Sequence, residues 1–138
     1  MEWNKGTLTI SDQRDKVDLD VVAGLLNKTY WGPRHVVEKL VASLLCFSLY
    51  NGKNQIGFAR IVTDFTVFSW LSDIVIAPDF QGRGLGQWLC ECILSHPDLQ
   101  KTQFVLQTTT VHSFYERFGF RSRQELMTRL PESTRHSN

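Results

Sequence analysis

The sequence has almost no net charge and no grouping of metal-ligating residues. Its 15 Lys and Arg residues are balanced by 14 Asp and Glu residues, which leaves a formal net charge of +1 at pH 7. A chain this close to neutrality lacks the basic surface typical of proteins that bind nucleic acid or an anionic membrane. Its 3 cysteines and 4 histidines are not spaced as zinc ligands or as a redox pair. We therefore expect no nucleic-acid partner and no bound metal.

The sequence also lacks long apolar runs. No run approaches the ~20 residues that span a membrane, and the first residues lack the apolar core of a signal peptide. Cys46, Cys90 and Cys92 are odd in number and lie in apolar segments, which is typical of reduced structural thiols inside the cell. These features predict a cytoplasmic protein without a membrane partner.

No internal repeat, charge block or Pro-, Gly- or Ser-rich linker divides the chain. Its 138 residues are a usual length for one domain, and 42% of them are hydrophobic, which is enough for an ordinary core. We therefore predict a single domain over residues 1–138, in which the polar residues 131–138 form a frayed tail.

Apolar periodicity predicts a meander followed by alternating strands and helices. Asp18 or Asp20 is expected to cap the first helix, Pro33 to begin the second, and Asn51-Gly52 to form a hairpin turn. The run 67–77 is nearly continuously apolar, which is typical of a central strand buried on both faces. This order predicts an α/β protein with one mixed sheet and a strand–helix–strand crossover at its centre. Strands are predicted at 6–10, 46–50, 55–63, 67–77, 103–108 and 120–130, and helices at 19–26, 33–44, 85–95 and 112–118.

The segment between the 67–77 strand and the next helix is rich in glycine. It reads Gln81-Gly82-Arg83-Gly84-Leu85-Gly86. The glycines leave backbone amides uncovered and allow a ligand to approach, and amides at a helix N-terminus favour anions. Arg83 adds a fixed positive charge that can bind phosphate oxygens. The pattern predicts a cradle for a phosphate or pyrophosphate; the alternative is a glycine-rich turn without a ligand.

Two common nucleotide signatures do not match this loop. The Walker pattern GxxxxGK[ST] is absent, because no Lys-Ser or Lys-Thr follows the glycines. The dinucleotide pattern GxGxxG fails at Gln87, and the loop follows a meander instead of opening a βαβ unit. The phosphate ligand is therefore expected to belong to another class.

Two blocks of this sequence are together similar to a known family. The segment from Gln81 to Gly86 reads as Q-x-x-G-x-G, which resembles the coenzyme A signature of the GNAT (GCN5-related N-acetyltransferase) superfamily. The second block, QFVLQTT at 103–109 and HSFYERFGF at 112–120, resembles the family's strand and the helix that carries a tyrosine before a Gly-Phe pair. Both blocks occur in the family's order, and the resemblance extends over nearly the whole chain. It implies a single central sheet, mixed and mostly antiparallel, with one splayed strand pair and about four flanking helices.

The resemblance implies where acetyl-CoA would bind. Its pyrophosphate would lie on the loop amides, and its pantetheine arm would pair like an extra strand with the end of the 67–77 strand, whose backbone groups need partners where the strands splay. His112 lies where the family carries a small polar residue; it is expected to contact the cofactor or relay a proton, or else to cap its helix or lie on the surface. The implied cofactor-binding residues are Ile74, Val75, Ile76, Gln81, Gly82, Arg83, Gly84, Leu85, Gly86, His112 and Tyr115.

The implied reaction is acetyl transfer to a primary amine of a small molecule or peptide, by direct attack in a ternary complex. Tyr115 is the candidate proton donor to the departing thiolate; the alternative is a core aromatic residue. Asp73 is a lone carboxylate in an apolar strand, so it is either a base, acting directly or through water, or the partner of Arg60 in an ion pair. No cysteine nucleophile is expected, because all three cysteines lie at core positions.

The acceptor pocket is expected beside the segment that joins the first two helices. Thr29-Tyr30-Trp31-Gly32 forms either an aromatic lip of the pocket or a hydrophobic staple against the second helix. Trp70 and Asp73 are further candidate substrate-binding residues, with Tyr30 and Trp31. A second interpretation of the same residues is a non-catalytic acyl-CoA-binding or sensing module. An exposed edge strand would also allow a homodimer.

Overall fold

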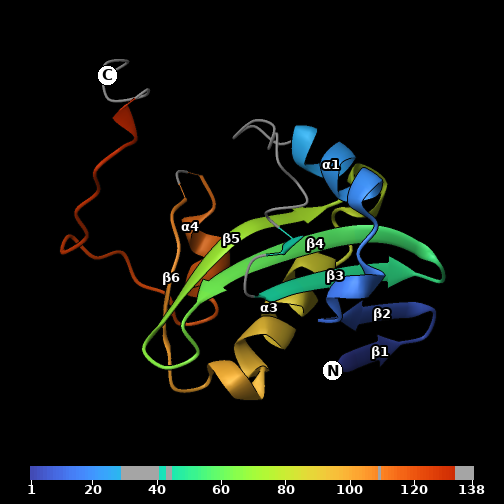
Figure 1. Cartoon of the computed structure of the whole chain (residues 1–138), viewed down its shortest axis with the longest axis horizontal. Coiled ribbons are helices and arrows are strands. Elements are labelled where there is room, and N and C mark those ends of the chain that lie inside the picture. The colour runs from blue at the N-terminus through green and yellow to red at the C-terminus, as the bar shows by residue number, and fades with distance from the viewer. Residues whose placement is uncertain (29–40, 43–44, 109, 133–138) are drawn as a thin grey trace. The chain divides into compact units, whose positions relative to one another are not determined.

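The computed structural model describes residues 1–28, 41–42, 45–108 and 110–132. Its contacts divide the chain into two compact units, Met1–Gln107 and Thr108–Asn138. The first unit holds one six-stranded sheet whose strands lie side by side in chain order (Figure 1). Neighbouring strands are antiparallel except the last two, which are parallel, so the predicted mixed and mostly antiparallel sheet is confirmed. The strands are β1 (Glu2–Lys5), β2 (Leu8–Ser11), β3 (Leu45–Asn51), β4 (Asn54–Thr63), β5 (Phe68–Ile76) and β6 (Gln103–Val105).

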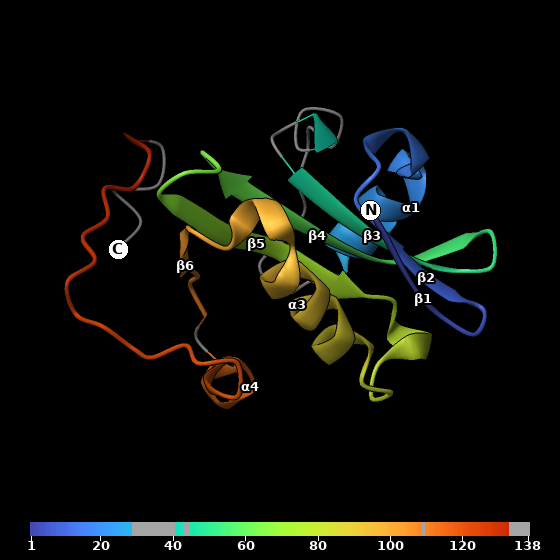
Figure 2. The same ribbon diagram turned by 90° about the horizontal axis from the view of Figure 1, so that it is seen from below.

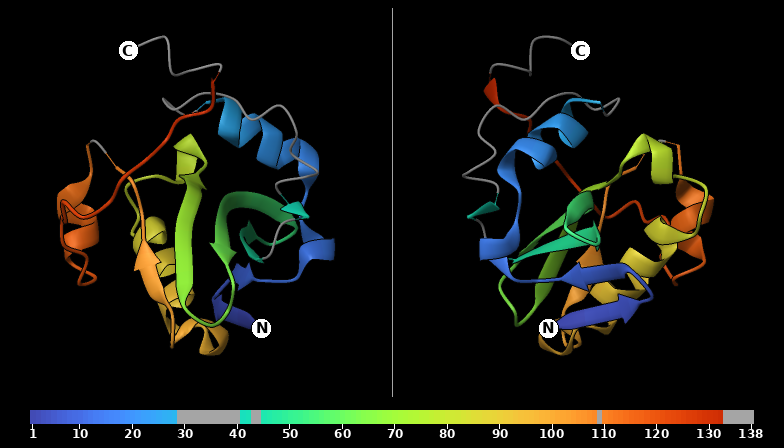
Figure 3. Two further views of the ribbon diagram at one scale, coloured as in Figure 1. Left: turned by 60° about the vertical axis from the view of Figure 1, so that its left-hand side comes forward. Right: turned by 90° about the vertical axis from the view of Figure 1, so that its right-hand side faces the viewer.

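The predicted meander is confirmed, and one strand precedes it. β3 and β4 form the hairpin expected around Asn51-Gly52, where Gly52 has the φ of +60° that the tight turn requires. The sequence did not reveal β1, which pairs with β2 around a turn at Gly6 and lies at the edge of the sheet (Figure 3, right). An edge strand whose faces are exposed buries few side chains, so the residues of β1 do not need an alternating apolar pattern, and they have none.

Two helices cover opposite faces of the sheet in the first unit (Figure 2). Helix α1 (Leu19–Asn27) begins where predicted, because the Asp18 side chain caps it by accepting a hydrogen bond from the Val21 amide at 3.2 Å. Helix α3 (Leu85–Ser95) follows the glycine-rich loop and ends before His96, as predicted. The helix predicted at 33–44 falls almost wholly on 29–40 and 43–44, which lie outside the described residues.

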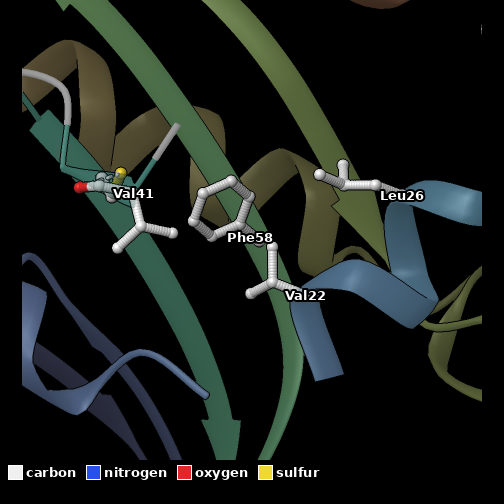
Figure 4. Close-up of a cluster of buried hydrophobic side chains, with 5 residues drawn as sticks. Val22, Leu26, Val41 and Phe58 are labelled. Atoms are coloured by element: carbon white, nitrogen blue, oxygen red, sulfur yellow. Dashed lines mark hydrogen bonds between the residues drawn. The ribbon is translucent and has the colours of Figure 1, made fainter. Parts of the chain in front are cut away.

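The core beneath α1 is an apolar cluster (Figure 4). Val22 and Leu26 of α1 pack with Phe58 of β4, and all three have no exposed surface. Burying one such side chain contributes about 1.5–3 kcal/mol. The cluster also contains Val41 and Cys46, and Val75 packs against it. It therefore joins α1 to β3, to β4 and to the end of β5.

The strand–helix–strand crossover lies at the edge of the sheet, not at its centre as predicted. It consists of β5, α3 and β6, and β6 is the last strand of the sheet. β5 is also not buried on both faces, since Ser69 and Leu71 are buried whereas Trp70 and Ser72 are half-buried. An apolar run favours burial, but the neighbouring elements decide it, and β6 pairs only with the first residues of β5.

The second unit contains helix α4 (His112–Glu116), which lies within the predicted range 112–118. Gly119 follows with a φ of +93°, consistent with the predicted stop. The strand predicted at 120–130 is wrong: this segment is irregular and, beyond residue 120, exposed. Its polar first half offers no apolar face to bury, and it joins no ladder among the described residues. The predicted tail, 131–138, lies mostly outside the described residues. The described residues contain three α-helices, whereas about four were expected.

One carboxylate organises the turn between β4 and β5. Asp64 accepts hydrogen bonds from the amides of Thr66, Val67 and Phe68 at 2.9, 2.8 and 3.0 Å. These bonds hold the pKa of Asp64 below its usual value of 3.8. A lowered pKa in the folded state adds stability that is complete above pH 3.8 and is lost as the pH falls through the folded pKa.

We expect Asp64→Asn to unfold at a lower temperature than the wild type near neutral pH, because the amide keeps the shape of the acceptor without its charge. The difference in Tm should shrink as the pH falls below 3.8 and the wild-type carboxylate becomes protonated. Thermal denaturation of both proteins across a series of pH values measures this. A difference that stays constant down to the most acidic pH would contradict the assignment.

Candidate functional site

β5 has an open edge along its second half. β6 pairs with it only from Phe68↔Gln103 to Trp70↔Val105, while β4 pairs along its other side as far as Ile76. The two parallel strands therefore separate beyond Trp70, which confirms the predicted splayed pair (Figure 3, left). Within the described parts of the chain, no strand pairs with this side of β5 beyond Trp70.

The alternation of hydrogen bonds between β4 and β5 decides which backbone groups point to the open edge. The Ala77 amide donates to the Ile56 carbonyl at 2.7 Å, so these two residues form a hydrogen-bonded pair. Bonded and non-bonded pairs alternate along an antiparallel ladder. The backbone of Val75 therefore faces β4, whereas Ile74 and Ile76 direct their amides and carbonyls to the open edge. Two of the three residues predicted to pair with pantetheine thus present their backbone there.

A β-bulge at Asp73 sets this alternation. The ladder pairs Phe58 with Val75 and Arg60 with Ser72, so two residues of β5 lie opposite one residue of β4. Asp73 has a φ of +54°, in the left-handed region that Gly, Asn and Asp tolerate best. The bulge bends β5 close to the point at which β6 leaves it.

Asp73 is held by an ion pair across the bulge. Its side chain is only 1% exposed, and its Oδ2 accepts a hydrogen bond from Nε of Arg60 at 2.8 Å. The same guanidinium places Nη2 at 3.5 Å from the Ser72 hydroxyl oxygen. Of the two alternatives that the sequence leaves for Asp73, the ion pair with Arg60 is therefore present in the structure.

The glycine-rich loop carries a row of backbone amides into the start of α3. Gly82 and Gly84 both have a φ of +77°, and Gly84 caps the helix in the left-handed conformation. Among the described residues, no group accepts a hydrogen bond from the amides of 82–87, and the helical bonds begin with the Trp88 amide on the Gly84 carbonyl at 3.1 Å. A Cβ added at Gly82 or Gly84 would meet nothing within 4 Å. The space around both glycines is therefore open.

Side chains of the loop fix its position and add charge. Nε2 of Gln81 donates to the Ile76 carbonyl at 3.0 Å, which ties the loop to the end of β5. The Arg83 guanidinium lies 5.1 Å from the centre of the Phe80 ring, a cation–π contact that keeps the positive charge beside the loop. Leu85 is buried and anchors the first turn of α3. The loop is thus held against the end of β5.

These features fit a diphosphate joined to an extended, amide-bearing arm. Amides without acceptors, the positive end of the α3 dipole and the Arg83 charge all favour a polyanion. The open edge of β5 ends at Ile76, where Gln81 attaches the loop. One elongated molecule therefore matches both the amide cradle and the strand edge.

Tyr115 and His112 lie in the second unit, on α4. Tyr115 is half-buried, and its ring packs edge-on against Phe114 and Phe120 with centroids 5.0 and 5.8 Å away. This packing suits both alternatives for Tyr115, so its role as proton donor stays a prediction. His112 is exposed at the first position of α4, with Val111 as the N-cap and no capping side chain, so it lies on the surface and does not cap the helix.

Trp70 lies on a partly exposed apolar part of the sheet. It is half-buried on β5, opposite Val62 of β4, and its ring centroid is 6.4 Å from that of Phe68. Val62 and Phe68 are 39% and 38% exposed. This surface suits the apolar part of an acceptor. The other candidate acceptor residues, Thr29, Tyr30, Trp31 and Gly32, lie outside the described residues.

The cysteines are structural, as predicted. Cys46, Cys90 and Cys92 are all buried, and burial raises the pKa of Cys46 and of Cys92 to about 11. Thiols with such pKa values stay protonated near neutral pH and are poor nucleophiles.

Where the structure describes the chain, no three His, Cys, Asp or Glu side chains gather as a metal site. No helix in those same ranges combines the length and apolar character of a membrane span.

Two positioning contacts were not evident from the sequence. The side chain of Gln81 holds the loop to β5, although its place in the motif points only to its amide. Gly57 on β4 allows a close approach, since a Cβ there would lie 3.0 Å from Cδ1 of Ile76 and 3.1 Å from Cβ of Leu49. A glycine inside an apolar strand is the signal that would have identified the second contact.

Known proteins resemble this chain in both sequence and fold. Residues 42–122 match the family model of the acetyltransferase (GNAT) domain. A crystal structure of a candidate GNAT-family acetyltransferase from Xanthomonas campestris pv. campestris is 30% identical, has a TM-score of 0.83, and matches over 90% of this chain and 93% of that one.

Two curated relatives carry related names. A candidate acetyltransferase of Gibberella zeae is 24% identical over 150 residues, which cover 89% of this chain and 84% of the relative. The protein ycf52 of Gracilaria tenuistipitata var. liui, named an uncharacterized N-acetyltransferase, is 32% identical over 114 residues, which cover 75% of this chain and 62% of the relative. The matched family model spans more than half of the chain and includes the bulge, the open edge and the glycine-rich loop. The chain therefore belongs to the GNAT family of acetyltransferases.

Proposed function

We propose that this protein is an acetyl-CoA-dependent N-acetyltransferase that acetylates a primary amine of a small molecule or peptide. The observation that carries the proposal is the combination, within the first unit, of the amide row at 82–87 and the open edge of β5. Acetyl-CoA has a diphosphate that suits the first feature and an amide-bearing arm that suits the second. A GNAT structure from Elizabethkingia anophelis with acetyl-CoA bound shares the fold, at 21% identity and a TM-score of 0.66.

In this proposal the loop and strand hold the cofactor by their backbone. The amides of 82–87 and the Arg83 guanidinium bind the diphosphate, and the backbone of Ile74 and the amide of Ile76 bind the pantetheine arm. Val75 supports the strand from the core side, where it packs on the cluster beneath α1. When bound, acetyl-CoA supplies an acetyl group already activated as a thioester.

The remaining work of the protein is to position the acceptor and to manage protons. The amine must reach the thioester without its extra proton, and the departing thiolate is stabilised by receiving one. We assign the second step to the hydroxyl of Tyr115, on the strength of the family pattern around it. Trp70, with Tyr30 and Trp31, is proposed to line the acceptor site. Attack is direct, because the buried thiols of Cys46 and Cys92 are not available as nucleophiles.

Thermal unfolding with and without ligand tests cofactor binding. A ligand present at about 100 times its Kd stabilises the folded state by about 2.7 kcal/mol. For 138 residues this corresponds to a rise in Tm of roughly 9 °C. We expect such a rise with acetyl-CoA and with CoA, and none with ATP at the same concentration. An unchanged Tm with both CoA species would contradict the proposed site.

Release of the CoA thiol in the presence of amines tests catalysis. We expect one or more members of a panel of small amines and amino-terminal peptides to accelerate release of CoA from acetyl-CoA, with formation of the acetylated amine detected by mass spectrometry. Binding of acetyl-CoA without transfer to any member would instead favour the non-catalytic acyl-CoA-binding module.

A further inference from the structure

We propose that Arg60 is a positioning residue for the acetyl-transfer site. Through its ion pair with Asp73, it keeps the bulge of β5 in the form that turns the backbone of Ile74 to the open edge. This inference rests on the proposed function, because that edge is where the pantetheine arm is expected to bind.

The bulge determines which backbone groups at the end of β5 face β4 and which face the open edge. In a regular ladder continued from the pair of Arg60 and Ser72, Phe58 would lie opposite Ile74. The extra residue moves Phe58 opposite Val75 instead. Because bonded and non-bonded pairs alternate, a shift of one residue exchanges the groups that face β4 with those that face outward. Loss of the bulge would therefore turn the amide and carbonyl of Ile74 away from the open edge.

The bulge needs a partner that offsets its unfavourable features. Asp73 adopts a φ of +54°, and its carboxylate is 1% exposed, where a charge without a counter-charge is strongly disfavoured. Arg60 meets this need from the neighbouring strand, with Nε 2.8 Å from Oδ2 and its own side chain only 17% exposed. Cys46, opposite Arg60 on β3, adds no charge near neutral pH because burial raises its pKa to about 11.

A positioning role and a base role for this pair predict different behaviour of the same variants. Asn tolerates the left-handed φ, and its Oδ1 can accept the hydrogen bond from Arg60. Asp73→Asn therefore keeps the bulge but removes the carboxylate that a base requires. The double variant Arg60→Met with Asp73→Asn removes the link between the strands without leaving a buried charge alone.

Calorimetric titration with acetyl-CoA tests the proposal without knowledge of the acceptor. We expect Asp73→Asn to bind within about threefold of the wild type, and the double variant to bind about tenfold more weakly, as the loss of one hydrogen bond implies. Lys16→Met, which breaks the exposed 2.7 Å ion pair with Glu2, is the matched control and should bind like the wild type. A double variant that is folded by circular dichroism and binds like the wild type would overturn the proposal.

The pH dependence of acetylation, measured with an amine that the panel identifies, separates positioning from base catalysis. Asp73→Asn should retain the acid limb of the kcat/KM profile and most of its height, while the double variant loses rate at every pH. Loss of the acid limb in Asp73→Asn, with a rate about 100-fold lower, would assign Asp73 as the base and overturn the proposal. A wild type that binds no acetyl-CoA would instead refute the proposed function itself.

Discussion

Gly84→Val should strongly weaken the binding of acetyl-CoA. We expect the dissociation constant for acetyl-CoA to rise about 100-fold, which corresponds to a loss of about 2.7 kcal/mol of binding free energy. The reason is steric and conformational together. Gly84 caps α3 with a φ of +77°, and its surroundings are open, so a branched side chain would strain the cap and occupy space beside the amides of 82–87.

Gly52→Val is the control that separates strain from binding. Gly52 has a φ of +60° and equally open surroundings, but it lies in the turn between β3 and β4. Both variants should lose stability, because a β-branched residue is disfavoured in the left-handed region. Only Gly84→Val should lose affinity for acetyl-CoA in calorimetric titration. Wild-type affinity in that variant would show that the loop is not the diphosphate site.

Tyr115→Phe should lower the rate of acetylation about 100-fold, a usual contribution of acid–base catalysis. The ring would keep its edge-on packing against Phe114 and Phe120, so affinity for acetyl-CoA should hardly change. The loss should therefore appear in kcat and not in the KM for acetyl-CoA. Steady-state kinetics with a reactive amine from the panel measure both.

Tyr50→Phe is the matched control for the lost hydroxyl. Tyr50 lies on β3, opposite Thr9 of β2, and its hydroxyl donates to the Lys16 carbonyl. We expect this variant to lose some stability and to keep its acetylation rate. Unchanged turnover in Tyr115→Phe would leave Tyr115 as a packing residue and would require another donor for the thiolate.

Short-range features of this protein could be predicted from the sequence. Asp18 caps α1, Asn51-Gly52 turns the β3–β4 hairpin, and the glycines of 82–86 leave amides exposed at the start of α3. Each depends on the conformational preferences of a few adjacent residues, so its signal is contained in a short window. The family resemblance likewise rests on short segments, the glycine-rich loop at 81–86 and the block 103–120.

Features that depend on distant segments could not be predicted in this way. β1 is a strand because β2 offers it an edge, whereas the predicted strand 120–130 joins no ladder among the described residues. The crossover lies at the edge of the sheet because no described strand lies beyond β6. Strand formation is a property of the pair and not of the single segment.

Asp73 shows the same division within the candidate site. The sequence by itself determined that a lone carboxylate lies within the apolar run 67–77, and that it needs either a partner or a chemical role. Only the tertiary structure decided that Arg60 is the partner, with its Nε 2.8 Å from Oδ2 of Asp73 across a bulge. A bulge depends on the register between two strands, and register is set by packing across the whole sheet.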